Sequence, residues 1–278
     1  MTSGAPGLPP VDLRPQSVLL TLFGDYVDGE GEYVAARGVL DLLDTAGVGE
    51  HATRATLNRM VKRGLLARQA IGRQAYFGLT GFGRRTVLDG RERAHAPEPA
   101  ESGWDGRWTL VSFSMPEDAQ KQRHELRSRL LWAGFGMVQP GLWAAPRTVD
   151  VAALLSDLEA RDHVDVFGGE PQAPTDASEM LRRAFDLDGL AARYVEFAAR
   201  WGRLARSGAA RAKDPLACRV VLSTDWLQVI RDDPRLPLEF LDPGWPAVEA
   251  GRLYRAFDEE LRPLAEEQAG ERLDVVVA

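Results

Sequence analysis

Two side chains four residues apart, Arg54 and Asn58, have the chemistry that recognises base edges in DNA. An arginine fork can donate two hydrogen bonds to guanine, and an asparagine amide can pair with adenine in the same bidentate way. Arg59 and Lys62 follow further along, where contacts to phosphates are expected. Because residues three and four apart share one side of a helix, a helix here would present these groups together. This spacing predicts recognition of double-stranded DNA.

The elements that must position these side chains are a helix and a hairpin. Leu57, Met60 and Val61 have helical spacing and predict one buried stripe. Gly64 suits the residue just past the helix because glycine adopts the left-handed conformation without penalty. Residues 71–74 form a glycine-containing turn between two short apolar runs, which predicts a hairpin with an arginine at its tip. The expected DNA-binding residues are His51, Arg54, Ala55, Asn58, Arg59, Lys62, Arg73 and Gln74.

Some of these side chains have a plausible structural role instead. Arg59 could form a salt bridge with Asp41 or Asp44 of the preceding helix as readily as it contacts DNA. His51 fits a capping or solvent position better than a base-contacting one. Arg73 could enter the adjacent minor groove or bind the DNA backbone.

The charge of this region differs from that of the rest of the chain. Between His51 and Arg93, ten Lys and Arg residues oppose Asp89 and Glu92, a net charge of +8, so the remainder of a chain whose total is −7 has −15. A basic segment in an acidic protein is typical of a nucleic-acid-binding module. The alternative is a solvated helix and hairpin with an incidental excess of arginine.

Further helices are expected around the DNA-binding helix, at residues 14–27, 35–45 and 80–93. The tight turn at residues 46–48 would join the second and third helices into a helix-turn-helix. With the hairpin added, the sequence predicts a winged helix-turn-helix domain over residues 12–95.

A second domain is expected at residues 104–172, after a linker rich in Pro, Ala and Glu at 95–103. Strands are predicted at 107–115, 135–139, 142–145 and 164–167, and helices at 119–133 and 149–160. The order βαββαβ is that of a ferredoxin-like unit.

Helices are expected for the remainder, as an all-α C-terminal domain at residues 176–270. An apolar seam with alternating spacings of three and four runs along one of them, through Leu187, Leu190, Tyr194, Phe197, Trp201 and Leu204. The seam could form a dimer interface or the core of its own domain. The predicted fold class is therefore α+β with several domains.

Length and composition set the broad class. With 278 residues, 45% hydrophobic and 27% charged, the chain can bury proper cores. The N-terminal residues lack the apolar run of a signal peptide, and no stretch reaches the roughly 18 apolar residues of a membrane span. The single cysteine, Cys218, cannot form an intramolecular disulfide. A cytoplasmic protein with no membrane partner is expected.

Catalytic patterns are missing from the sequence. The four histidines are scattered, with no two at metal-ligand spacing on one element. Gly81-Phe82-Gly83 is followed by two arginines, which is a basic helix and not a phosphate-binding loop. We therefore expect no enzyme, no bound metal and no cofactor.

Three blocks of sequence follow one another in a characteristic order and spacing. The first comprises TLFGDYV at residues 21–27, RATLNRMVKRGLL at 54–66 and IGRQAYFGLT at 71–80. The second comprises WDGRWTLVSF at 104–113 and GFGMVQPGLWAAP at 134–146, and the third is DPRLPLEFLDPGWP at 233–246. Over about residues 14–262, the chain resembles the PaaX family, bacterial repressors of aromatic (phenylacetic acid) degradation operons.

The resemblance implies a homodimeric regulator that binds operator DNA. It also implies release from DNA by an aryl-coenzyme A thioester, with phenylacetyl-CoA as the effector of the best-known members. A dimer is expected on physical grounds as well, since one winged helix contacts too few base pairs for genomic specificity. The family's middle domain is similar to small CRISPR-associated endonucleases of ferredoxin-like fold.

Metal-dependent nuclease activity is accordingly the alternative function. Those endonucleases end their first strand with a metal-binding aspartate, whereas this chain has Ser114, and a hydroxyl is a poor ligand for a hard cation. Glu117 and Asp118 resemble the acids of a helix N-terminus. The middle sheet could instead bind single-stranded RNA by stacking, although its large residues are expected to cover the helices.

An effector pocket would need apolar walls for an aryl group and cations for coenzyme phosphates. The central domain offers such residues, and the expected effector-binding set is Trp104, Arg107, Trp108, Arg123 and Trp143. For each aromatic residue a place in the core of the sheet is the more frequent alternative. The expected effector is phenylacetyl-CoA or another acyl-CoA.

Overall fold

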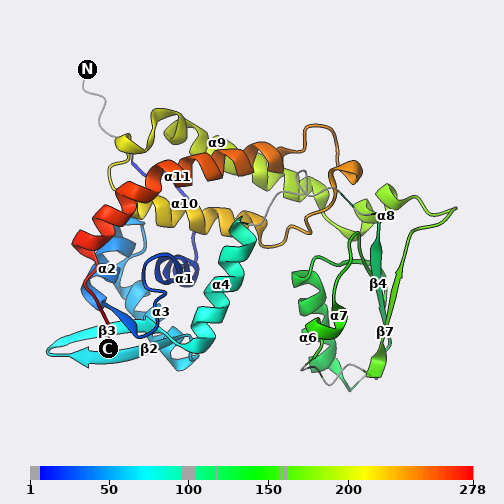
Figure 1. Cartoon of the computed structure of the whole chain (residues 1–278), viewed down its shortest axis with the longest axis horizontal. Coiled ribbons are helices and arrows are strands. Elements are labelled where there is room, and N and C mark those ends of the chain that lie inside the picture. The colour runs from blue at the N-terminus through cyan, green and yellow to red at the C-terminus, as the bar shows by residue number, and fades with distance from the viewer. Residues whose placement is uncertain are drawn as a thin grey trace. The chain divides into compact units, whose positions relative to one another are not determined.

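The chain has a mixed α+β fold with two antiparallel four-stranded sheets, seen in a computed structural model that describes residues 7–95, 104, 106–116, 118–156, 158 and 162–277 (Figure 1). The chain divides into two compact units. Unit 1 comprises Met1–Ala96, Glu196–Gln228 and Ala250–Ala278, and unit 2 comprises Pro97–Val195 and Val229–Glu249. Residues 176–270, predicted as one helical domain, are thus shared between the two compact units. Beyond His95, the predicted linker at 95–103 lies outside the described residues.

The N-terminal part of unit 1 contains helices and short strands in alternation. Its elements are α1 (Pro15–Tyr26), β1 (Glu32–Ala35), α2 (Ala36–Thr45), α3 (Glu50–Lys62), β2 (Leu66–Ile71), β3 (Gln74–Leu79) and α4 (Gly81–His95). The helices and the hairpin that the sequence predicts are confirmed, with small differences at their ends. Strand β1 was not predicted, because four residues are too few for a hydrophobic period to show.

The sheet of unit 1 includes residues from both ends of the chain. Its strand order is β2-β3-β1-β8, where β8 (Val275–Val277) follows the last helix. In the register of β1 with β8, Val34 lies opposite Val275. The Tyr76 hydroxyl on β3 donates a hydrogen bond to Asp274 at 2.5 Å. The C-terminal residues therefore belong to the same sheet as the β2–β3 hairpin.

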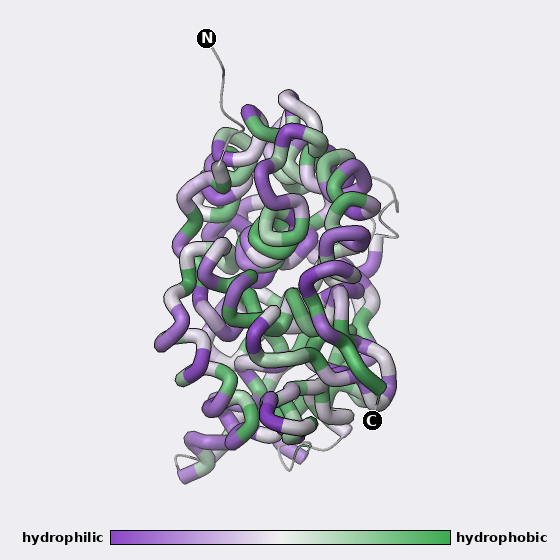
Figure 2. The backbone as a smooth tube through the Cα atoms, turned by 90° about the vertical axis from the view of Figure 1, so that its left-hand side faces the viewer, coloured by the Kyte–Doolittle hydropathy of each residue, from purple (hydrophilic) through white to green (hydrophobic). Residues whose placement is uncertain are grey.

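Two helices from the C-terminal third complete the core of unit 1. They are α10 (Pro215–Ile230) and α11 (Pro246–Arg272). Leu216 and Val220 of α10 lie in the same apolar cluster as Leu19 and Phe23 of α1, and α11 contributes Ala265. Hydrophobic and hydrophilic residues alternate along the helical turns in Figure 2, as is typical of helices with one apolar side.

Unit 2 is built on the second sheet. Its elements are β4 (Trp108–Phe113), α6 (Gln120–Trp132), β5 (Gly136–Gln139), β6 (Leu142–Ala145), α7 (Val151–Leu154), β7 (Val164–Gly169) and α8 (Ala177–Ala184). All its neighbouring strands are antiparallel, in the order β5-β6-β4-β7. The helix predicted at 149–160 is shorter than expected: Asp150 caps α7 by accepting the Ala153 N–H at 3.0 Å, and α7 ends at Leu154.

Helices pack on both faces of this sheet at β4 and β6, whereas the edge strand β7 is largely exposed. Val111 and Trp143 pack with Leu130 of α6 on one face. Trp108 packs with Leu181 of α8 on the other. Because side chains of a strand alternate between faces, β4 supplies residues to both cores.

Helix α9 (Leu187–Ser207) contains the predicted apolar seam, and the boundary between the two units falls within it. The seam residues from Leu190 to Leu204 are buried within the single chain. In unit 1, Phe197 contacts Trp226 with ring centroids 5.1 Å apart, and Trp201 contacts Phe257 at 6.4 Å. The seam is therefore part of a core, and the interpretation as a dimer interface does not apply to it.

Candidate nucleic-acid interface

Helix α3 has one buried side and one exposed side. Its buried residues are Thr53, Thr56, Leu57 and Met60. Since successive residues turn by about 100° around a helix, the opposite side is centred on positions 51, 55, 58 and 62. Of these four residues, His51, Asn58 and Lys62 are exposed and Ala55 is half-buried. Arg54 and Arg59 flank this outer face and are exposed too. The structure thus brings six of the eight predicted DNA-binding residues onto one side of α3.

The turn between α2 and α3 sets the direction of α3. Gly47 has a φ of +85°, which ends α2 in the left-handed conformation. The Val48 N–H donates to the Leu43 carbonyl at 2.7 Å, and the Gly47 N–H donates to the Asp44 carbonyl at 3.0 Å. Val48 is buried in the core of unit 1. The turn is therefore closed by hydrogen bonds and anchored by an apolar side chain.

Arg54 has a partner on its own helix. Its guanidinium lies 2.7 Å from the Glu50 carboxylate, and both side chains are more than half exposed. Such an exposed pair adds only a few tenths of a kcal/mol to stability, so it orients Arg54 and leaves the guanidinium available to another partner. We did not single out Glu50 from the sequence, although its spacing of four residues before Arg54 was the available signal.

Arg59 also bonds within α3. It donates to the Thr56 hydroxyl at 2.7 Å, and that hydroxyl donates to the Ala52 carbonyl at 2.7 Å. The alternative partner Asp41 lies 4.0 Å from Arg37 instead. The guanidinium of Arg59 thus remains on the exposed side of the unit, next to the outer face of α3.

The β2–β3 hairpin presents the other two predicted residues. Ile71 pairs with Gln74, which leaves Gly72 and Arg73 as a two-residue turn. Gly72 has a φ of +61°, the conformation that a type II′ turn requires at this position. Arg73 and Gln74 are exposed at the tip, and the hairpin projects from the body of unit 1 in Figure 1.

Thr80 joins the base of the hairpin to the end of α3. Its hydroxyl donates to the Gly64 carbonyl at 2.5 Å and accepts the Gly83 N–H at 3.0 Å, at the start of α4. Gly83 lies so close to the Leu65 carbonyl that a Cβ there would be 2.0 Å from the oxygen. This close approach requires glycine at position 83. It brings the start of α4 next to the end of α3 and the base of the hairpin.

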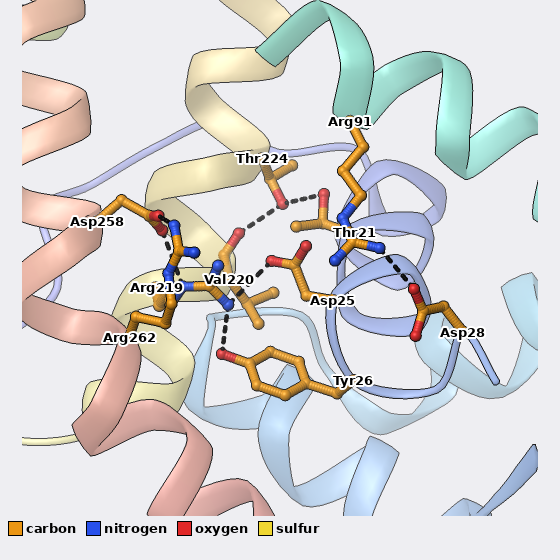
Figure 3. A network of polar contacts seen from close by, with 10 residues as sticks. All are labelled: Thr21, Asp25, Tyr26, Asp28, Arg91, Arg219, Val220, Thr224, Asp258 and Arg262. Atoms are coloured by element: carbon orange, nitrogen blue, oxygen red, sulfur yellow. Dashed lines mark hydrogen bonds and ion pairs between the residues drawn. The ribbon is translucent and has the colours of Figure 1, made fainter. Parts of the chain in front are cut away.

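A polar network lies behind these elements, on the side of α1 that faces α10 and α11 (Figure 3). Arg219 of α10 lies 3.3 Å from Asp25 and 2.8 Å from Asp258, and it donates to the Tyr26 hydroxyl at 2.9 Å. Arg262 also bonds Asp258, at 2.7 Å. The signal that we missed in the sequence was a charged residue within the apolar run at 216–222.

Burial and charge shift the pKa values in this network. Burial raises the pKa of Tyr26 to about 12, although the Arg219 cation opposes this shift. Burial alone would lower the pKa of Arg219, but the nearby carboxylate of Asp25 raises it above its usual value. The guanidinium is therefore charged and pairs with carboxylates from two different helices.

The predicted effector-binding residues do not form one group. Trp104 and Trp108 contact each other, with ring centroids 6.2 Å apart, on the α8 side of the sheet. Trp143 lies in the core on the α6 side. Arg123 donates to the carbonyls of Met115 and Pro116 at 3.0 and 2.8 Å, and Arg107 is exposed. The three aromatic side chains have core positions.

The described residues contain no group of three or more His, Cys, Asp or Glu side chains that could hold a metal ion. Ser114 is exposed at the end of β4, where its N–H donates to the His163 carbonyl at 3.3 Å. Glu117 lies outside the described residues. None of the helices in the described part of the chain is long and apolar enough to cross a membrane.

Three successive parts of the chain each match a domain model of the same protein family. The family model of a PaaX-like protein matches residues 14–83, that of the PaaX protein central Cas2-like domain matches 101–181, and that of the PaaX-like protein C-terminal domain matches 185–270. The Transcriptional repressor PaaX of Escherichia coli (strain K12) is 28% identical over 269 residues, which cover 92% of this chain and 83% of the relative. Among solved structures, the uncharacterized protein Rv0674 from Mycobacterium tuberculosis is similar in fold, with a TM-score of 0.58 and 21% identity over 92% of this chain and 99% of that one.

Proposed function

Because the chain belongs to the PaaX family, whose domain models match it in succession, we propose that it is a repressor that binds operator DNA through a winged helix-turn-helix. The E. coli relative is named a transcriptional repressor, which makes the family one of regulators and not of enzymes. The observation that carries the proposal is the exposed outer face of α3, with two arginines, a lysine and an asparagine directed away from the core.

The side chains of this face have separate roles in the proposal. Arg54 and Asn58 lie in the first half of α3, where the second helix of a helix-turn-helix reaches base edges in the major groove. Arg59 and Lys62 lie further along and bind phosphates, which fixes the register on the duplex. Arg73, at the hairpin tip, contacts the adjacent minor groove or backbone. Residues 12–95 form the DNA-binding domain in this proposal.

The central domain would have a ferredoxin-like fold. The order β5-β6-β4-β7 supports this assignment, because a split βαββαβ unit places its first strand in the middle of the sheet, beside its third and fourth. Ser114 at the end of β4 does not favour nuclease activity, since the equivalent ligand would be a carboxylate. A structural or effector-sensing role of this domain fits the family better than catalysis.

We further propose that the repressor is a homodimer on a palindromic site, controls an aromatic-compound degradation operon and is released by an acyl-CoA. Two copies are needed because specific recognition requires more base pairs than one α3 can contact. Isothermal titration with a panel of acyl-CoAs, with operator release as the second readout, tests the effector.

Arginine 54 provides the test of DNA binding. We expect Arg54→Ala to weaken binding to an operator selected from random duplexes by about 5- to 100-fold, as the loss of a base-contacting arginine does. Lys62→Ala should reduce the salt dependence of binding by about one phosphate contact without changing sequence preference. Fluorescence anisotropy of the labelled duplex measures both.

The matched control for this test is Arg37→Ala. Arg37 lies on α2, and 87% of its side chain is exposed, so the substitution removes the same charge away from the outer face of α3. Equal effects of Arg54→Ala and Arg37→Ala would show that α3 binds DNA by net charge alone, and the proposed base contacts would then be wrong.

A further inference from the structure

We propose that residues 272–277, which we call the β8 segment, belong to the DNA-binding module and hold the β2–β3 hairpin in the position from which Arg73 contacts DNA. The predicted boundaries of that module, 12–95, leave this segment out. Figure 1 shows the C-terminal end of the chain close to the hairpin, and β8 lies in the same sheet. The positioning role rests on the proposed DNA-binding function, whereas the effect of the segment on the hairpin can be tested without DNA.

A row of three residues crosses the sheet from the hairpin to the β8 segment. Ala35 of β1 lies opposite Tyr76 of β3, and the Ala35 N–H donates to the Asp274 carbonyl at 2.9 Å. Residues directly opposite each other share one face of a sheet, and the spacing of strands is about 4.8 Å, so the row spans about 10 Å. Because alanine has no side-chain atom beyond Cβ, the Tyr76 ring can lie across Ala35. Its hydroxyl then reaches the Asp274 carboxylate, at 2.5 Å.

Tyr76 is the point at which the hairpin tip joins the core. Residues 70–74 at the tip are exposed, and Tyr76 is the buried residue nearest to them. Arg73 lies three positions before it on the same hairpin. A two-stranded hairpin alone is marginally stable in water, and further strands beside it supply the missing support. The contact between Tyr76 and Asp274 therefore fixes the base from which Arg73 projects.

The β8 segment also packs against the helix-turn-helix. A Cβ at Gly38, in the first turn of α2, would lie 2.7 Å from the Arg272 carbonyl oxygen, so the two backbones are in close contact. Leu273 is buried in the same apolar cluster as Leu57 of α3. One short segment thus contacts both the helices and the hairpin. We infer that it sets the position of Arg73 relative to the outer face of α3.

Hydrogen–deuterium exchange of the full chain, read by mass spectrometry, tests the contact with the hairpin. Asp274 is exposed, so Asp274→Ala removes the acceptor of the Tyr76 hydroxyl and leaves the core intact. We expect the amides of residues 66–79 to exchange about 3- to 10-fold faster, as the loss of one hydrogen bond allows, and those of α3 to keep their rate. Asp274→Asn retains an acceptor oxygen and should exchange like the wild type. Unchanged exchange of the hairpin in Asp274→Ala, an equal increase in α3, or an equal increase in Asp274→Asn would overturn the proposal.

Two proline substitutions at neighbouring positions test the pairing of β8 itself. Hydrogen-bonded pairs occur at every second position of an antiparallel ladder, so the bond from Ala35 to Asp274 makes Tyr33 and Val276 the next bonded pair. The N–H of Val277 then points away from β1. Val276→Pro removes a donor from the ladder and should speed exchange of the hairpin, whereas Val277→Pro should not. Equal exchange rates in the two variants would contradict a supporting role of β8.

The positioning role has its own readout, which is operator affinity. Loss of the Asp274 charge alone would strengthen binding to DNA, so weaker binding of Asp274→Ala, by about 2- to 10-fold, reports the position of the hairpin. In an Arg73→Ala background the same substitution should have no further effect, because the contact that it positions is already missing.

The outcomes of these assays separate the two proposals. An equal loss of operator affinity with and without Arg73, or faster exchange of the hairpin with unchanged operator affinity, would refute the positioning role. Since the exchange assay contains no DNA, failure of the Arg54→Ala test would contradict the proposed DNA contacts and leave the contact between the β8 segment and the hairpin in place.

Discussion

Replacing Arg219 with methionine should destabilise unit 1 by about 3 kcal/mol, because Arg219 pairs with two carboxylates in the interior. The guanidinium is 9% exposed, and it lies 3.3 Å from Asp25 and 2.8 Å from Asp258, which are 14% and 3% exposed. Breaking a buried ion pair by removing one partner costs about 3–5 kcal/mol, since the remaining charge stays desolvated. Asp258 keeps Arg262 as a partner, so the lower end of this range applies.

Arg262→Met is the matched control for this substitution. It removes a guanidinium from the same Asp258 carboxylate, but Arg262 is 44% exposed and solvent screens its charge. The expected loss is about 1 kcal/mol or less. The difference between the two variants therefore measures the effect of burial together with the two further partners of Arg219, Asp25 and Tyr26.

Urea unfolding of the full chain, followed by far-UV circular dichroism, measures both variants. The m value should remain that of the wild type while the midpoint falls, because the buried area does not change. A loss below about 1 kcal/mol for Arg219→Met, or a loss equal to that of Arg262→Met, would refute the reasoning. In that case apolar packing would account for the stability of this core, and the polar network would contribute little to it.

Two further substitutions follow from the same region. Tyr26→Phe should reduce the loss of stability at alkaline pH. Burial raises the pKa of Tyr26 in the folded state to about 12, against an ordinary value of 10. The stability contributed by Tyr26 is therefore complete below pH 10 and is lost as the pH rises towards 12, and urea midpoints measured across this range test it. Gly83→Ala should cost about 1–3 kcal/mol of unfolding free energy, because its Cβ would lie 2.0 Å from the Leu65 carbonyl oxygen. Gly81→Ala meets only the end of the Arg85 side chain at 3.8 Å and should be neutral, and equal thermal shifts of the two alanine variants would contradict the close approach at Gly83.

Local sequence rules were sufficient to predict the helix and hairpin that carry the proposed DNA-binding residues. The spacing of Leu57 and Met60 predicted the buried side of α3, and both residues are buried. Gly64 and Gly72 were predicted to end the helix and to form the turn, and their φ values are +72° and +61°. These predictions depend on residues within a few positions of one another, where helical periodicity and turn chemistry determine the conformation.

Contacts between distant residues could not be predicted in this way. Tyr76 bonds Asp274 across 198 residues, and Arg219 bonds Tyr26 across 193. No periodicity in the sequence near either residue identifies its partner, because each side chain taken alone would also suit an exposed or helix-capping position. The C-terminal strand β8 was missed for the same reason, because its three residues form a strand only when β1 is beside them.

Closeness in sequence was a poor guide for the expected effector residues. Trp108 and Trp143 are on adjacent strands, β4 and β6, but they lie on opposite faces of the sheet. The alternation of side chains along strands separates them, and a correct pairing register was needed to see this. The register was unknown from the sequence, because it is fixed by packing on both faces.

The proposed DNA-binding surface depends on a helix far outside residues 12–95. Leu216 and Val220 of α10 share the core of α1, and Thr224 donates to Thr21 at 3.0 Å. Arg219 of α10 also pairs with Asp25 of α1. One buried helix from the C-terminal third thus packs against the helix that shares its core with α3. A displacement of α10 would reach α1 directly, because close-packed interiors transmit displacement between neighbouring elements.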